Sequence, residues 1–128
     1  MLLTNAPISA VLHAEDIDRA KKFYTEAIGL KLVKENTERG ELYFEAGMGS
    51  RLLVYKRART KAEHTAAGFA VDNLEQVVEE LKAKGVKFED YDFPGLKTVN
   101  GIATFGEEKA AWFTDPEGNI IAIAQGMR

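Results

Sequence analysis

Residues 112–124 read Trp-Phe-Thr-Asp-Pro-Glu-Gly-Asn-Ile-Ile-Ala-Ile-Ala, and this stretch decides the fold. Its two apolar runs flank an Asp-Pro-Glu-Gly segment at 115–118, in which proline presets φ and glycine supplies a positive φ. The stretch therefore predicts two strands joined by a tight turn. Residues 41–55 align with it without a gap, in a register that places Tyr43 on Trp112 and Gly49 on Gly118. The chain thus contains this hairpin twice.

The segments that precede the two hairpins also repeat, in a register that places Ile17 on Leu74. We therefore expect one domain, 1–128, built from two βαβββ modules at 6–57 and 63–126. In the first module we expect strands at 8–13, 30–34, 41–45 and 51–56, and a helix capped by Asp16 or Asp18 that ends near Ala27. In the second module we expect a strand at 65–71, a helix capped by Asp72 with Glu75 as its capping-box partner, a strand that begins at Val86, and the final hairpin.

The hairpins lie farther apart in the sequence than the segments that precede them, which places additional residues in the segment 89–106 of the second module. An insertion in one copy of a repeated unit is typical of a lid or a pocket wall. The alternative is a longer surface crossing. The side chains of Tyr91, Phe93, Pro94 and Leu96 are too apolar for a purely solvated loop.

The composition excludes several classes of function. The net charge is −3 without a basic face, which argues against nucleic acid as a partner, and the basic run 56–61 reads as a solvated linker. There is no cysteine, so disulfides, thiolate metal sites and cysteine nucleophiles are excluded. The first residues show neither an export signal nor a membrane span, and we expect a cytoplasmic protein without a membrane partner.

Three motifs carry a resemblance to a known family. They are Asp-Ile-Asp-Arg-Ala at 16–20 with Phe-Tyr at 23–24, Phe-Ala-Val-Asp-Asn-Leu at 69–74, and Phe-Thr-Asp-Pro-Glu-Gly-Asn at 113–119. Together with the duplication, the chain resembles the vicinal oxygen chelate superfamily, which includes glyoxalase I, extradiol dioxygenases and bleomycin-resistance proteins. The resemblance implies an α+β fold in which two βαβββ modules form a curled, cup-shaped mixed sheet with helices on its outer face. It also implies a homodimer.

In the metal-dependent members of that superfamily, four positions that face the cup supply His or Glu ligands to a divalent ion. The resemblance carries these positions over to Ser9, Leu53, Ala66 and Ala122. The internal repeat relates the same positions in pairs, because its first register aligns Ser9 with Ala66 and its second aligns Leu53 with Ala122. Two alanines, a leucine and a lone serine are not a ligand set for a divalent ion, so we expect no metal and no cofactor.

The two histidines do not restore the metal site. His13 and His64 lie roughly 13 Å and 7 Å along their strands from the positions of Ser9 and Ala66, at about 3.3 Å per residue. The preferred interpretation of His64 is a strand-end residue with one nitrogen in water. A proton-transfer group of Thr114, His13 and Glu45 is conceivable but no spacing enforces it, and the catalytic residues stay unknown.

Strand alternation assigns an apolar, aromatic lining to the cup. Tyr43 and Trp112 are expected to stack on a planar or cationic ligand, or else to plug the cup or form a dimer contact. Arg51 is expected to pair with an anionic group of a ligand, or with Glu41 or Glu45 across the hairpin. The predicted ligand-binding residues are Ser9, Val11, His13, Tyr43, Arg51, Leu53, Tyr55, Ala66, Trp112, Thr114 and Ala122.

These features predict a metal-free protein that holds a small, partly aromatic organic molecule, in the manner of bleomycin-resistance proteins. The alternative is a glyoxalase-like lyase, isomerase or dioxygenase with an atypical site that uses His13 or His64. A third class is a protein-interaction subunit in which a partner chain closes the cup.

Overall fold

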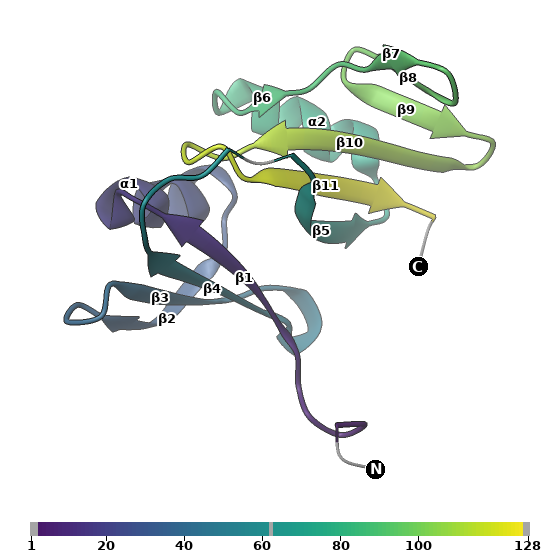
Figure 1. Cartoon of the computed structure of the whole chain (residues 1–128). Coiled ribbons are helices and arrows are strands. Elements are labelled where there is room, and N and C mark those ends of the chain that lie inside the picture. The colour runs from purple at the N-terminus through teal and green to yellow at the C-terminus, as the bar shows by residue number, and fades with distance from the viewer. Residues whose placement is uncertain (1–2, 62, 127–128) are drawn as a thin grey trace. The chain divides into compact units, whose positions relative to one another are not determined.

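The computed structural model describes residues 3–61 and 63–126, and the chain divides into two compact units, Met1–Arg59 and Thr60–Arg128. Each unit combines one mixed β-sheet with helical segments, which confirms the predicted α+β fold class (Figure 1). The boundary between the units falls between the two predicted modules. It stays a prediction that the two modules make up one domain with a common cup. No helix in the described ranges has both the length and the apolar character needed to cross a membrane.

Unit 1 is a four-stranded sheet with the strand order β1-β4-β3-β2. Strand β1 runs parallel to β4, and the other two neighbouring pairs are antiparallel. Its elements are β1 (Ser9–Ala14), α1 (Ile17–Lys22), the π-helix η1 (Phe23–Ala27), β2 (Lys31–Asn36), β3 (Glu41–Glu45), the 3₁₀ turn η2 (Gly47–Gly49) and β4 (Arg51–Lys56). This order is the predicted βαβββ module.

The helical segment of unit 1 begins at the first of the two predicted caps. The side chain of Asp16 accepts a hydrogen bond of 3.0 Å from the backbone N–H of Arg19, as an N-cap residue does. Tyr24 is fully buried, and its ring lies 5.7 Å from that of Phe44 on β3. The segment therefore covers one face of the sheet. It ends before Gly29, whose φ of +84° is the left-handed conformation expected after a helix.

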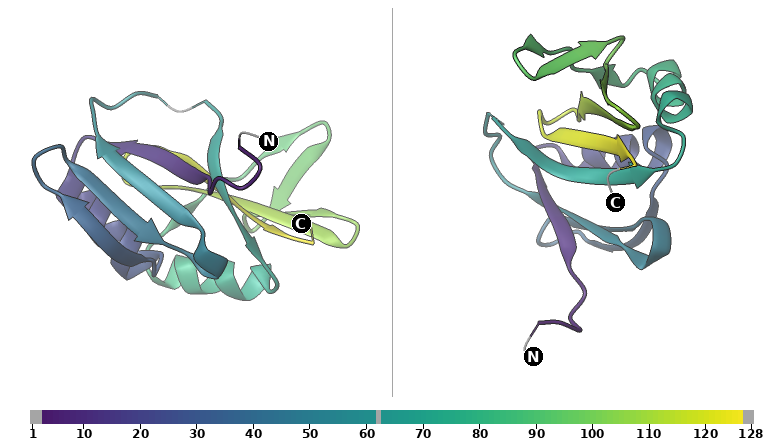
Figure 2. Two further views of the ribbon diagram at one scale, coloured as in Figure 1. Left: turned by 90° about the horizontal axis from the view of Figure 1, so that it is seen from below. Right: turned by 90° about the vertical axis from the view of Figure 1, so that its right-hand side faces the viewer.

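Unit 2 repeats this plan with additional strands, in the order β5-β11-β10-β9-β8-β7, with β6 also paired to β10. Strand β5 runs parallel to β11, as β1 does to β4. Helix α2 packs against β10 and β11 on one face of the sheet (Figure 2). The elements are β5 (Thr65–Val71), α2 (Leu74–Ala83), β6 (Lys87–Phe88), β7 (Asp92–Phe93), β8 (Leu96–Val99), β9 (Ile102–Phe105), β10 (Glu108–Thr114) and β11 (Ile120–Gln125).

The insertion at 89–106, for which no secondary structure was predicted, consists of short strands and tight turns. Strand β6 pairs with the end of β10, and β9 pairs with its beginning. In unit 1, the single strand β2 pairs with β3. In unit 2, the equivalent edge of β10 is paired with two strands, β6 and β9. Strands β8 and β7 then extend the sheet to a new edge (Figure 1).

The expected cap of α2 is wrong. The N-cap residue is Asn73 instead of Asp72, and its side chain makes no capping hydrogen bond. Glu75 forms an ion pair with Lys109 on β10, so it does not complete a capping box. The backbone N–H of Leu74 instead donates a hydrogen bond of 2.7 Å to the side-chain oxygen of Gln125 at the end of β11. A residue 51 positions away in the sequence thus satisfies the first turn of this helix.

We expect the replacement Gln125→Ala to lower the free energy of unfolding by about 1–2 kcal/mol, because it leaves a partly buried N–H without an acceptor. Asp72→Ala should cost less than about 0.5 kcal/mol, as is usual for a surface position. Urea denaturation of both variants, followed by circular dichroism, measures the difference. An equal or larger loss in the Asp72 variant would mean that Asp72 caps the helix after all.

The turn of the final hairpin is a buried polar cluster. One carboxylate oxygen of Asp115 accepts backbone N–H bonds from Glu117 at 2.9 Å and from Asn119 at 2.8 Å. The other oxygen accepts a bond of 2.8 Å from the Asn119 side chain. All three residues are buried. The Asp-Pro-Glu-Gly-Asn sequence therefore fixes the turn through its first side chain, in addition to the conformations of its proline and glycine.

Candidate functional site

The sheet of unit 1 has one covered face and one open face. Residues that point toward α1 and η1 are buried, among them Leu12, Phe44 and Val54. The alternate residues lie on the open face and are exposed or half-buried. The register of β1, β4 and β3 aligns them in three rows, which are Ser9–Arg51–Glu45, Val11–Leu53–Tyr43 and His13–Tyr55–Glu41. All the site residues predicted in this unit thus share one face.

Polar side chains on this open face are partly engaged with one another. Arg51 lies 3.6 Å from Glu45 across the hairpin, which is the pairing expected as the alternative to a ligand contact. The Tyr43 hydroxyl donates a hydrogen bond of 2.9 Å to Glu41. The ammonium group of Lys34 lies 5.3 Å from the centroid of the Tyr43 ring, within the range of a cation–π contact. Tyr43 is therefore held in place by a carboxylate and a cation.

The hydrogen bond from Tyr43 is the main reason that the pKa of the Glu41 carboxyl lies below its ordinary value, and Arg39 adds a hydrogen bond and a favourable charge. A carboxyl whose pKa is lowered by folding stabilises the protein above its unfolded pKa, and the contribution disappears as the pH falls through the folded value. We expect Tyr43→Phe to raise the pKa of Glu41 toward its ordinary value. An NMR titration of the carboxyl carbon measures this change, with Tyr55→Phe as the control. An unchanged pKa would contradict the hydrogen bond.

The sheet of unit 2 has a matching open face. Trp112 on β10 lies opposite Ala122 on β11, which lies opposite Gly68 on β5. The two small residues leave space beside the indole ring. Thr114 lies on the same face, opposite Ile120. The sheet register shifts at this end of β5, between the pairs Ile120–Thr65 and Ile121–Ala67, so the exposed Ala66 lies at a β-bulge.

Tyr91 is a site residue that the sequence analysis did not select. Its ring lies 5.4 Å from that of Trp112 in an edge-to-face arrangement, and Phe93 lies 5.7 Å beyond it. Burial, followed by the nearby charge of Glu89, raises the pKa of the Tyr91 phenol, which therefore stays protonated as a hydrogen-bond donor. The apolar character of the insertion was the available signal. The contact supports the interpretation of this segment as a pocket wall.

The comparison with protein families assigns the chain. The family model for the Glyoxalase/Bleomycin resistance protein/Dioxygenase superfamily matches residues 8–123. The chain belongs to this superfamily. The match spans both units and confirms the resemblance that the three sequence motifs carry.

Individual superfamily members show the range of similarity. The chain is 32% identical over 123 residues to a protein of Arabidopsis thaliana named "Probable lactoylglutathione lyase, chloroplastic", covering 87% of this chain and 33% of that protein. It is 27% identical over 105 residues to the "Probable trivalent organoarsenical cleaving enzyme" of Bacillus subtilis, covering 80% of this chain and 68% of that protein. A glyoxalase family protein from Bacillus anthracis has the same fold, with a TM-score of 0.75 at 20% identity over 98% of both chains. The chain thus spans about a third of the Arabidopsis protein's length.

The residues at the four positions that the resemblance assigns to metal ligands do not fit a divalent ion. Leu53 and Ala122 have no donor atom in their side chains, Ala66 has none either, and Ser9 offers one hydroxyl. The described residues contain no group of three or more His, Asp or Glu side chains that could hold a metal ion. These four positions therefore offer aliphatic side chains and one hydroxyl group.

Proposed function

We propose that this superfamily member binds a small, partly aromatic organic molecule on the open faces of its sheets, without a metal ion. One observation carries the proposal. At two of the positions that the resemblance assigns to metal ligands, the directly opposed residue on the neighbouring strand is aromatic, since Leu53 lies opposite Tyr43 and Ala122 lies opposite Trp112. Metal-dependent relatives are expected to coordinate a substrate through an ion at these positions. This chain instead offers the aromatic rings of Tyr43 and Trp112 as stacking surfaces.

The side chains around Trp112 support the same chemistry. Gly68 and Ala122 leave room for a planar group beside the indole, and Tyr91 limits the space on the side of the insertion. Aromatic pairs of this kind contribute about 0.5–1.5 kcal/mol beyond the burial of their surface. On the open face of unit 1, independently of Trp112, Arg51 offers a cation to an anionic substituent, in competition with Glu45. A protein that binds this molecule without converting it needs no catalytic side chain in addition to these residues.

The test uses the full chain, in which Trp112 is the single tryptophan. We expect 8-anilinonaphthalene-1-sulfonate to quench Trp112 emission in a saturable manner. Ala122→Phe, which fills the space beside the indole, should weaken this probe at least about fivefold, equivalent to about 1 kcal/mol. Ala83→Phe on the exposed surface of α2 is the matched control and should leave the affinity unchanged.

Two results would refute the proposal. One is a stoichiometric divalent metal in the purified protein, measured by plasma mass spectrometry. The other is equal affinity for the probe in the Ala122→Phe and Ala83→Phe variants, because the probe would then bind elsewhere.

A second candidate is a glyoxalase-like lyase, favoured by the 32% identity to the protein named as a lactoylglutathione lyase. This candidate predicts turnover of the methylglyoxal–glutathione hemithioacetal, measured with and without added Zn²⁺ or Ni²⁺. His13→Ala should then lower kcat without lowering stability. Absence of turnover under every metal condition would leave binding as the supported function.

A further inference from the structure

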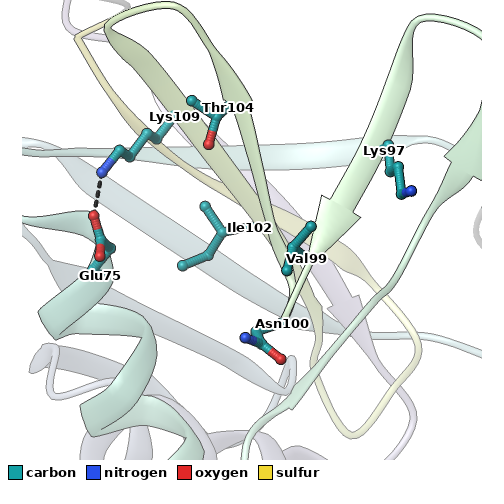
Figure 3. A pocket seen from close by; sticks show the side chains of 7 residues that line it. All are labelled: Glu75, Lys97, Val99, Asn100, Ile102, Thr104 and Lys109. Atoms are coloured by element: carbon teal, nitrogen blue, oxygen red, sulfur yellow. Dashed lines mark hydrogen bonds and ion pairs between the residues drawn. The ribbon is translucent and has the colours of Figure 1, made fainter.

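The sheet of unit 2 continues past the helix that covers it. Helix α2 packs against β10 and β11, whereas the sheet extends through β9 and β8. On its helix side, Ile102 lies opposite the buried Ala111, and Thr104 lies opposite Lys109. Val99 lies opposite Ile102 and is 65% exposed. A cavity of about 450 Å³ lies over these strands (Figure 3). Alternation along β10 places Trp112 on the face opposite to that of Lys109, which lines the cavity.

The lining of this cavity is apolar in the middle and charged at its sides. Ile102 and Val99 form the apolar part. On one side, Lys109 forms an ion pair with Glu75 from the first turn of α2, so the two charges compensate each other. Lys97 lies on the other side, beyond Val99 (Figure 3). Within 3–61 and 63–126 its ammonium group makes no ion pair, although Asp92 on β7 is its cross-strand neighbour, so Lys97 is available to pair with an anionic group of a ligand in competition with Asp92.

The wall of the cavity is fixed by contacts outside it. Asn100 and Gly101 form the two-residue turn between β8 and β9, with φ values of +55° and +84°. Lys82 on α2 donates a hydrogen bond of 2.8 Å to the carbonyl of Asn100. The carboxylate of Asp90 accepts bonds from the N–H of Gly101 at 3.0 Å and from the hydroxyl of Thr98 at 2.9 Å. A ligand would therefore enter a preformed site and order little of it.

We propose that this cavity is a second binding site, for a small molecule that carries one anionic group on an apolar body, such as an aromatic monocarboxylate. Its volume lies in the range of small-molecule sites, about 300–1,000 Å³. The apolar body would cover Ile102 and Val99, and the anionic group would pair with Lys97. The site goes beyond the proposed function, because it lies on the other face of the sheet and none of its residues takes part in the Trp112 site.

The experiment is an NMR titration of the ¹⁵N-labelled full chain with 2-naphthoate. We expect saturable shifts of the backbone amides of Lys97, Val99 and Ile102. Lys97→Gln should weaken 2-naphthoate about three- to fivefold, as expected for one exposed ion pair, and should leave the neutral analogue 2-naphthalenemethanol unchanged. Lys87→Gln, at an exposed lysine outside the cavity, is the matched control. Val99→Ser should weaken both compounds, because it removes apolar surface without touching the charge.

The proposal is overturned if the amides of the cavity do not shift, or if Lys97→Gln and Lys87→Gln have the same affinity for 2-naphthoate. The indole N–H signal of Trp112 reports the proposed ligand site in the same spectra. Shifts that are confined to this signal would support the proposed function and refute the second site. Shifts that are confined to the cavity would support the second site, and the titration with 8-anilinonaphthalene-1-sulfonate then decides the proposed function separately.

Discussion

Asp115→Ala lowers the free energy of unfolding by about 3–5 kcal/mol. The carboxylate accepts hydrogen bonds from the N–H groups of Glu117 and Asn119 and from the Asn119 amide, all in a buried turn. Alanine leaves these donors unpaired and out of reach of bulk water, so their desolvation is no longer compensated. Chemical denaturation measures the loss. Asp115→Asn keeps an acceptor oxygen and should recover part of the stability.

Asp16→Ala is the matched control, because it removes the same side chain from an exposed site. Asp16 accepts one backbone N–H, at the start of α1. A cap of this kind contributes about 1 kcal/mol. If both replacements lower the free energy of unfolding by the same amount, burial of the final turn does not explain the contribution of Asp115.

The hairpins could be predicted from the sequence because their signal is local. Alternation with a period of two fixes which side chains share a face, and the Asp-Pro-Glu-Gly turn fixes where the strand reverses. The strands at 41–45, 51–56 and 65–71 have the predicted boundaries. The residue that caps α2 could not be identified in this way, because the acceptor for the N–H of Leu74 is the side chain of Gln125, which lies 51 residues later in the sequence.

The insertion at 89–106 likewise has features that the local sequence could predict and features that depend on distant residues. Its strands have two to four residues each, too few for alternation to distinguish them from a loop. The Asn100–Gly101 pair is a strong hairpin signal that could have located the turn between β8 and β9. The contact of Tyr91 with Trp112 could not have been found, because it depends on how the insertion folds back across β10.

In unit 2, β6 and β9 pair with different parts of the same edge of β10, and this arrangement matters for protein engineering. Because β10 keeps its pairing with β11 along its whole length, the chain can lengthen or shorten at the break without altering the central hairpin. In directed evolution, the turn at 94–95 between β7 and β8 is therefore the place to graft loops of different length.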